Sequence, residues 1–279
     1  MKNSSTSNRI KSIRSSLVLT SFFFAGAFIS PVYSKCDKSG SDIMNQQNKK
    51  QSAATEQEEQ EIVILDIATK KKETRGMKRF MRKKSDDDKK SVMYFDSPKT
   101  IKGSGLLSWK TPEGDNQWLY IPELKKLQRI ASGSRKNYFM GTDFTYADLE
   151  GEDLKKNQYT CSQEVSCQKG KSTCYVIEAK PISDKEARNI GYSKRMLLVD
   201  KKDLITLKIV FFDLKGQKLK TAEYANWVED KGLWRPNLAI MDRHGVQKTY
   251  IKVNARTLNG SIDDMVLTKR FLEKEMHIK

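Results

Sequence analysis

The sequence predicts a mainly β protein built on one large, strongly curved antiparallel sheet with a few short helices. From Ile62 onward, short apolar runs follow one another and are separated by Gly, Pro, Asp and Lys, a spacing typical of all-β folds. Helical periodicity is scarce between these runs. The intervening turns are too short for parallel crossovers, which need about a dozen residues or more, so consecutive strands should be antiparallel neighbours.

The apolar runs predict the strands in order along the chain. They cover residues 62–69, 75–83, 91–96, 104–110, 116–121, 125–131, 155–161, 173–180, 192–200, 204–213, 216–228, 233–242 and 247–257. The sequence Asp213-Leu214-Lys215-Gly216 predicts a tight hairpin turn, because Gly216 accommodates a positive φ. Residues 241–245 predict another such turn.

Helices are expected at two places. Residues 181–190 predict a short helix that Ser183 or Asp184 caps. Near the end of the chain, residues 262–264 begin a terminal turn, and residues 267–276 show some helical periodicity. Neither segment is long enough to form a helical layer over the whole sheet.

The N-terminus has the pattern of a secretory signal peptide, which we assign to residues 1–34. A basic stretch precedes an apolar run from Leu17 to Ile29, and a small-residue cleavage site follows, with a cut after Ala27 as an alternative. Cys36 lies where a lipid-anchored protein carries its cysteine. Lys35 precedes it where a small residue is needed, so we do not expect lipid anchoring. The expected location is the periplasm.

The remainder of the chain divides into two parts. Residues 35–60 are rich in Lys, Gln, Ser and Glu and have almost no apolar period, which predicts a flexible polar N-terminus, with helix as an alternative toward its end. Residues 61–279 are long enough to bury a substantial core as one large domain.

The charge of the chain favours anionic partners. The formal net charge is +17, and removal of the four cations of the signal peptide leaves +13. Membrane head groups, acidic polymers and nucleic acid would all be attracted to such a protein. Export makes nucleic acid the poorest of these partners, and we expect none.

The cysteines predict a disulfide in the second half of the chain. Cys161, Cys167 and Cys174 lie close together in sequence, in a compartment where disulfides persist. Cys161 with Cys174 is the preferred pair, because residues 159–161 and 174–176 look like facing strand ends around a polar loop. Cys167 with Cys174 is the alternative.

No catalytic apparatus is recognisable in the sequence. The nearest approach to a nucleophile elbow or a phosphate loop is Gly103-Ser104-Gly105. The two histidines, His244 and His277, are remote from the cysteines, so neither a zinc site nor a histidine and acid pair is indicated. We therefore expect a protein that is not an enzyme and holds no metal or cofactor.

Several predicted strands are apolar on both faces. In the run 204–213, Ile209 and Phe211 point to one side, while Val210 and Phe212 add apolar surface to the other. An antiparallel sheet with one wet face should alternate cleanly. Something apolar must therefore cover both sides, either helices packed on the sheet or a ligand.

The densest pattern lies between Gln117 and Leu149. It comprises Trp118-Leu119-Tyr120-Ile121-Pro122, then Leu124-Lys125-Lys126-Leu127-Gln128-Arg129-Ile130, then Phe139-Met140-Gly141-Thr142-Asp143-Phe144-Thr145-Tyr146-Ala147-Asp148-Leu149. Trp118 and Tyr120 share one strand face, where large amphipathic rings can cover an apolar groove. The aromatic and methionine side chains around Gly141 form an adaptable apolar cluster. We expect Asp143 and Asp148 to bind the loop backbone rather than to do chemistry.

Together with the two-sided strands, this pattern predicts the residues that line a ligand cavity. They are Leu107, Trp109, Trp118, Tyr120, Phe139, Met140, Phe144, Tyr146, Ile209 and Phe211.

The same pattern resembles the outer-membrane lipoprotein-sorting family, the LolA-like proteins, in a branch with a W-x-Y-x-P … R strand pair and an F-M-G-(S/T)-D-F-(S/T)-Y-x-D-L loop. The resemblance covers roughly residues 62–273 and continues through residues 174–181, 192–194, 212–216 and 220–221. It implies an incomplete, half-open β-barrel of the LolA/LolB type. Members usually begin with an amphipathic helix in the mouth of the half-barrel, which residues 36–60 are too polar to supply convincingly.

The resemblance also implies a function. A periplasmic carrier would bind the acyl chains of a lipoprotein or lipid and transfer them toward the outer membrane, with an inner-membrane transporter, of the RND type for example, as donor and an outer-membrane acceptor. The alternative is a non-catalytic binding module for an acidic envelope polymer or an anionic membrane surface, which the charge of +13 favours.

Overall fold

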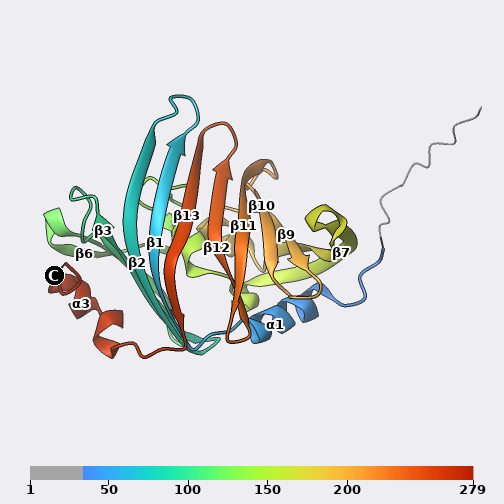
Figure 1. Cartoon of the computed structure of the whole chain (residues 1–279), viewed down its shortest axis with the longest axis horizontal. Helices are drawn as coiled ribbons and strands as arrows, with labels where there is room; N and C mark the ends of the chain where they lie inside the picture. The colour runs from blue at the N-terminus through green and yellow to red at the C-terminus, as the bar shows by residue number, and fades with distance from the viewer. Residues whose placement is uncertain (1–33, 279) are drawn as a thin grey trace, which may run out of the picture. The chain divides into compact units, whose positions relative to one another are not determined.

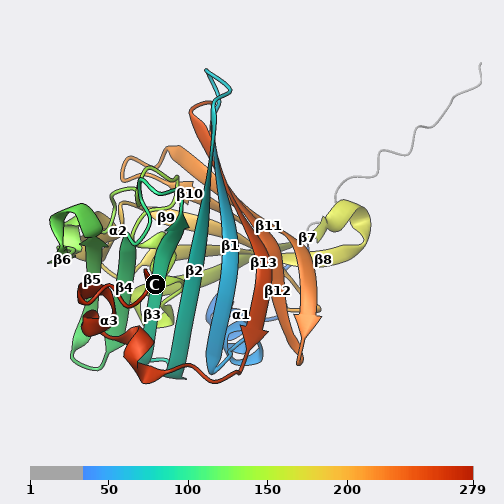
Figure 2. The same cartoon turned by 60° about the vertical axis from the view of Figure 1, so that its left-hand side comes forward.

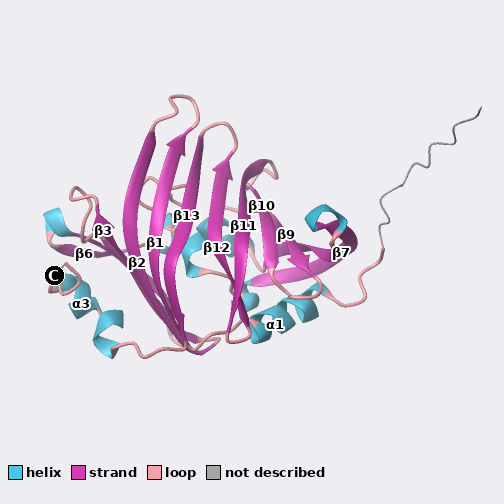
Figure 3. Cartoon of the chain, viewed as in Figure 1, coloured by secondary structure: helices cyan, strands magenta, loops and turns pink. Residues whose placement is uncertain are grey.

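The computed structural model describes residues 34–278. The predicted signal peptide therefore lies, except for Ser34, outside the described residues. The described part of the chain forms one sheet of 13 antiparallel strands. Short helices lie around this sheet (Figures 1 and 3). This confirms the predicted fold class. No helix in the described part is long and apolar enough to cross a membrane.

Every predicted strand is present, with shifted ends in several cases. The strands are β1 (Thr55–Asp66), β2 (Lys72–Ser85), β3 (Asp88–Ser97), β4 (Gly105–Thr111), β5 (Gly114–Ile121), β6 (Lys126–Arg129), β7 (Asn157–Cys167), β8 (Ser172–Pro181), β9 (Lys194–Asp200), β10 (Thr206–Phe212), β11 (Lys218–Asp230), β12 (Leu233–Arg243) and β13 (Gln247–Leu258). The predicted turn at residues 213–216 joins β10 to β11, and Gly216 has the positive φ of 79° that it requires.

The helices are short. They are α1 (Gly40–Lys50), α2 (Asp184–Ile190) and α3 (Lys269–Glu273), with 3-10 turns η1 (Pro122–Leu124), η2 (Ser132–Ser134), η3 (Asp148–Glu150), η4 (Leu154–Lys156), η5 (Gln168–Gly170) and η6 (Asp264–Leu267). The Ser183 side chain caps α2 by accepting from the Glu186 amide, as predicted.

The strand order requires one long connection between the two edges of the sheet. The order across the sheet is β6-β5-β4-β3-β2-β1-β13-β12-β11-β10-β9-β8-β7, so the first and last strands pair at the centre. The chain leaves the sheet at one edge, β6, and re-enters it at the other, β7. Residues 130–156 form this connection, and we call them the crossing segment. The sheet curves around this segment (Figures 1 and 2), and β6 and β7 do not pair.

The crossing segment defines the inner face of the sheet. Phe139 and Tyr146 pack against the inner sides of β1 to β5, in a cluster with Met77 and Phe95. Further along, Phe144 packs against the inner sides of β8 to β12. Much of the inner face is therefore covered by the chain itself.

The C-terminal segment covers part of the opposite, outer face. Phe271 and Leu272 of α3 pack with Tyr94, Leu107 and Tyr120 from β3 to β5. Figure 2 shows α3 lying over these strands. Strands β3 to β5 are apolar on both faces and need cover on both. The crossing segment covers their inner face, and the C-terminal segment covers their outer face.

Residues 35–60 are not a flexible segment, and their helix lies near the start of the segment rather than toward its end. They contain α1, which Ser39 caps, and the first seven residues of β1 precede the predicted start at Ile62. Two apolar side chains, Ile43 and Met44, suffice to bury one face of α1. A Cβ atom on Gly40 would lie 2.7 Å from the backbone of β7, so glycine permits this close approach.

The disulfides differ from the preferred prediction. Cys36 bonds to Cys161, and Cys167 bonds to Cys174, which is the alternative pair. Cys161 and Cys174 do not face each other, because Cys161 pairs with Ile177 in the ladder of β7 and β8, and Val165 pairs with Cys174. The bond at Cys36 ties the residues just before α1 to the edge strand β7.

The tether on α1 is testable. In a Cys36→Ser/Cys161→Ser variant, amide hydrogen exchange across residues 40–50 should accelerate, because a disulfide typically contributes about 2–4 kcal/mol. Exchange in β1 and β13 should remain slow. The matched control is Cys167→Ser/Cys174→Ser, which removes a bond between residues only seven apart. Unchanged exchange in α1 would show that the helix does not depend on the tether.

Candidate functional site

Two adjacent clefts lie between the inner face of the sheet, the crossing segment and α1, and we treat them as the two arms of one site because they share lining residues. One arm has a volume of about 330 Å³ and lies against β9 to β12. The other has a volume of about 280 Å³ and lies against β2 to β5. Ligand sites typically occupy about 300–1,000 Å³, so each arm alone is near the lower limit and the two together are within the range.

The first arm is mainly apolar, and we call it the apolar arm. Its wall comes from α1, the crossing segment and four strands. The apolar side chains that line it are Met44, Phe144, Leu197, Ile205, Ile209, Phe211, Tyr224, Trp227, Trp234, Pro236 and Met241. Three of these, Phe144, Ile209 and Phe211, are among the predicted cavity residues.

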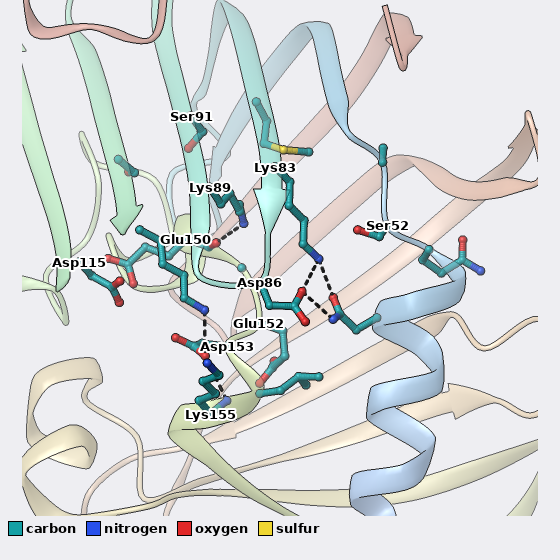
Figure 4. A pocket seen from close by; sticks show the side chains of 18 of the residues that line it. Ser52, Lys83, Asp86, Lys89, Ser91, Asp115, Glu150, Glu152, Asp153 and Lys155 are labelled. Atoms are coloured by element: carbon teal, nitrogen blue, oxygen red, sulfur yellow. Dashed lines mark hydrogen bonds and ion pairs between the residues drawn. The ribbon is translucent and has the colours of Figure 1, made fainter. Parts of the chain in front are cut away.

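The second arm, the polar arm, is lined by amides, hydroxyls and charged groups. Figure 4 shows the side chains that converge on it from β2, β3, the crossing segment and the end of α1. Lys83 Nζ lies 2.6 Å from Asp86 Oδ1, and Lys110 Nζ lies 3.1 Å from Asp153 Oδ1. The polar arm is therefore a place for a charged or hydrogen-bonding group.

The two arms meet at residues that belong to both. These are Gln51, Gly151, Glu152 and Arg235. Arg235 Nη2 donates to the Gln51 carbonyl at 2.9 Å, and its Nε lies 3.2 Å from Glu56 Oε2. The Glu152 carboxylate is held by Arg195 at 2.7 Å. The junction is thus built from groups whose positions are fixed by ion pairs.

A buried lysine holds the crossing segment in place. Lys220 of β11 is fully buried, and its Nζ lies 2.6 Å from Asp148 Oδ2 and donates to the Asp143 carbonyl at 2.9 Å. The Tyr192 hydroxyl donates to the other oxygen of Asp148 at 2.9 Å. Burial lowers the pKa of Lys220, and the attraction of Asp148 opposes this shift.

Asp143 provides a second attachment. Its carboxylate accepts from the Thr249 hydroxyl at 2.7 Å and lies 3.1 Å from Arg243 Nε. Burial raises the pKa of Asp143, while Thr249 and Arg243 act in the opposite direction. Asp148 also accepts from the Thr145 amide at 2.7 Å and so binds the loop backbone, as predicted, whereas the Asp143 carboxylate binds side chains of β12 and β13 instead.

A charged cluster underlies the middle of the inner face. Glu58 is almost fully buried and lies 2.7 Å from Arg256 Nε and 3.1 Å from Arg79 Nη1. Burial alone would raise the pKa of Glu58, but the charges of Arg79 and Arg256 outweigh it and lower the pKa to about 2. Acidic residues alternate along the start of β1, so the apolar pattern that predicted this strand begins only at Ile62.

The structure separates the other predicted cavity residues from the cleft. Phe139, Met140 and Tyr146 pack in or against the apolar cluster of β1 to β5. Leu107, Trp109, Trp118 and Tyr120 lie on the outer face, where the C-terminal segment covers them. Trp109 also borders the polar arm, but its indole N–H donates to the Leu267 carbonyl on the outer side. Trp118 and Tyr120 thus share one strand face, and the C-terminal segment packs on that face.

Sequence reasoning missed the aromatic wall of the apolar arm. Trp227 and Trp234 flank the turn between β11 and β12, and Tyr224 lies on the same wall. Asn226 has a positive φ of 53°, which interrupts the alternation of β11 just before Trp227. Two tryptophans on either side of a short turn were the available signal.

The one cluster of metal-ligand residue types among the described residues consists of Cys167, Cys174 and Asp200, and its two cysteines are bonded to each other.

Comparison with known proteins identifies the family. Residues 87–274 match the model of a protein family whose description reads "-like: Uncharacterized protein". A solved structure named as an outer membrane lipoprotein-sorting protein domain from Vibrio parahaemolyticus is 26% identical, with a TM-score of 0.77 over 84% of this chain and 98% of that one. The chain belongs to this LolA-like family.

Two further solved structures share the LolA-like fold. A DUF1329 family protein from Desulfovibrio piger has a TM-score of 0.77 at 22% identity, over 84% of this chain and 97% of that one. A LolA superfamily protein from Nitrosomonas europaea has a TM-score of 0.66 at 17% identity, over 84% and 99%. At these identities they show the fold alone. No match is found among curated proteins.

The buried pair that anchors the crossing segment gives one prediction. Lys220→Met leaves Asp148 buried without its partner and should lower the free energy of unfolding by about 3–5 kcal/mol in a denaturant titration. The control is Lys208→Met, which breaks an exposed pair with Glu223 at 2.7 Å on adjacent strands and should cost less than about 1 kcal/mol. Equal losses in both variants would contradict an anchoring role for Lys220.

Glu58 gives a prediction for pH. Its pKa in the folded protein is about 2, below the ordinary value of 4.5, so its stabilising effect is present above about pH 4.5 and is lost as the pH falls toward 2. Glu58→Gln should therefore be less stable than the parent at pH 7 and lose less stability on acidification.

Denaturant midpoints at several pH values measure the difference between the two proteins. Glu61→Gln is the control, because Glu61 makes a partly exposed pair with Lys252 on the same strand pair. Parallel acid profiles for Glu58→Gln and the parent would refute the prediction.

Proposed function

We propose that this LolA-like protein is a carrier that binds the acyl chains of a lipoprotein or lipid in the apolar arm and transfers them toward the outer membrane. The observation that carries the proposal is the apolar arm itself, a cleft of about 330 Å³ that the chain leaves unfilled beneath α1. The likeness to a lipoprotein-sorting domain supports it. Phe144, Ile209 and Phe211 are the predicted residues that would contact the ligand.

The physical chemistry of the arm suits a reversible carrier. Each methylene group that leaves water contributes about 0.8 kcal/mol, so ten would supply about 8 kcal/mol. Association costs about 4 kcal/mol or more, which offsets a large part of this gain. A ligand held in this way needs no covalent bond, and a competing partner can remove it. We propose no catalytic role.

Helix α1 borders both arms and would act as a lid. Met44, Gln47 and Gln51 line the apolar arm, and Asn45 and Asn48 line the polar arm. Hydrogen bonds hold the helix to the turn before β10, for example from Gln47 Nε2 to the Leu204 carbonyl at 3.0 Å. Because few apolar groups of α1 are buried, its separation from the sheet would enlarge the cleft at modest cost.

The proposed location is the periplasm. The predicted signal peptide and the two disulfides support it, since disulfides persist in exported proteins. Cys36 has its sulfur in a disulfide and therefore offers no free thiol for a lipid anchor. An inner-membrane transporter, of the RND type for example, would deliver the cargo, and an outer-membrane acceptor would take it.

The apolar arm can be blocked by one substitution. Trp227→Asp places a charge in its wall and should weaken binding of a fluorescent fatty acid at least about tenfold, because the chain would have to pack against a carboxylate. Val246→Asp is the matched control, since Val246 is exposed in the turn before β13. Titration of both variants and the parent measures the difference.

The same titration tests the alternative function. Binding that is driven by acyl burial should change little with ionic strength, whereas binding of an acidic polymer should collapse as salt rises. Native mass spectrometry of the protein purified from the periplasm, followed by organic extraction, identifies any cargo. A protein that carries no lipid and ignores the fatty acid would refute the carrier proposal.

A further inference from the structure

Three lysines form a row across neighbouring strands on the inner face. Lys83 of β2 pairs with Lys89 of β3, and Lys89 pairs with Lys110 of β4. All three line the polar arm. Like charges directly opposite each other in a sheet repel and destabilise it. These three lysines therefore destabilise the sheet unless a negative charge lies near them.

The outer two lysines of the row have such a charge, and the middle one does not. Lys83 pairs with Asp86, and Lys110 pairs with Asp153. Lys89 Nζ instead donates to the backbone carbonyl of Glu150 at 2.7 Å, as Figure 4 shows. Among the described residues, no carboxylate oxygen lies within 4.0 Å of Lys89 Nζ.

Burial and the neighbouring positive charges act on Lys89 together. Desolvation and the charges of Arg79, Lys83 and Lys110 lower the pKa of Lys89 to about 8, although Glu150 opposes this shift. An anion beside Lys89 would relieve the repulsion within the row. The polar arm has room for it, with a volume of about 280 Å³.

The acidic residues of the polar arm already have partners. Asp115 pairs with Lys156, Glu150 with Arg135, and Glu152 with Arg195. Asp86 and Asp153 pair with the outer lysines of the row, as described above. These carboxylates therefore do not leave a surplus negative field at Lys89 that would exclude an anion.

Hydroxyl groups complete the surroundings of the row. Ser91 and Ser108 lie directly opposite each other on β3 and β4, two residues from Lys89 and Lys110 on the same face. Both line the polar arm. Ammonium and hydroxyl donors in this number suit a phosphate group, which offers several acceptor oxygens at once.

We propose that the lysine row Lys83, Lys89 and Lys110 binds the phosphate group of an amphiphile whose acyl chain occupies the apolar arm. The inference rests on the proposed carrier function and names the class of its ligand. Gln51, Gly151, Glu152 and Arg235 line both arms, so a molecule that passes this boundary would reach both of them. Lys89 contributes the ammonium group that is left for the ligand.

The test uses three probes with the intact mature protein. Hexadecyl phosphate carries both the chain and the phosphate, hexadecanol carries the chain alone, and inorganic phosphate carries the anion alone. Affinities are measured by isothermal titration below the concentrations at which the probes aggregate. The parent protein should bind hexadecyl phosphate at least about tenfold more tightly than hexadecanol, which is the contribution expected of charge-assisted hydrogen bonds.

Matched variants separate the two arms. Lys89→Gln should lose about tenfold in affinity for hexadecyl phosphate and keep the parent affinity for hexadecanol. Lys215→Gln, at an exposed turn, is the control and should behave as the parent. Trp227→Asp should weaken both amphiphiles, because it acts on the shared chain site.

Each outcome decides the matter. Equal affinity of the parent for both amphiphiles overturns the phosphate site and leaves the carrier proposal standing. If neither amphiphile binds, both proposals fail. A loss of hexadecanol binding in Lys89→Gln also overturns the proposal, because the lysine would then only support the fold. If the parent binds inorganic phosphate and Lys89→Gln does not, the result supports the anion site and identifies free phosphate as a second ligand of that site.

Discussion

The ion pair between Lys220 and Asp148 holds the crossing segment against the sheet, and the position of this segment determines the shape of the interior. Because the first and last strands pair at the centre of the sheet, residues 130–156 must pass from one edge to the other across the inner face. A buried pair costs much desolvation and is retained here together with tyrosine and backbone partners. Where the segment is pinned determines what remains open, namely one cleft on each side of residues 151 and 152.

Local patterns in the sequence predicted the strands but not the charged start of β1. A period of two and turn residues such as Gly216 mark strands without knowledge of their neighbours. Glu56 and Glu58 lie on the inner face because Arg79, Arg235 and Arg256 reach them from other strands, and such long-range pairing leaves no local signal. The same holds for α1, whose polar side chains are satisfied by the backbone of the turn before β10.

The candidate site was harder to predict than the fold for a related reason. Periodicity shows that Trp118 and Tyr120 share a face, but it does not show whether a ligand or residues 262–277 cover that face. The structure assigns this cover to the C-terminal segment. It assigns the cleft to Trp227 and Trp234, which the sequence displayed beside a turn and which the irregular backbone at Asn226 removed from a simple alternation.

The central pairing of β1 with β13 also governs how the chain can reach this structure. The strands from β1 to β6 and from β7 to β13 form two meanders of local hairpins, each of which can assemble from contacts that are close in sequence. Joining them requires residues near positions 60 and 250 to meet, so the last strand must be available before the sheet is continuous. Such a contact carries a large loop-closure cost and slows folding. Until it forms, the central edges of both meanders stay open to wrong partners, so a newly made chain needs protection during that interval.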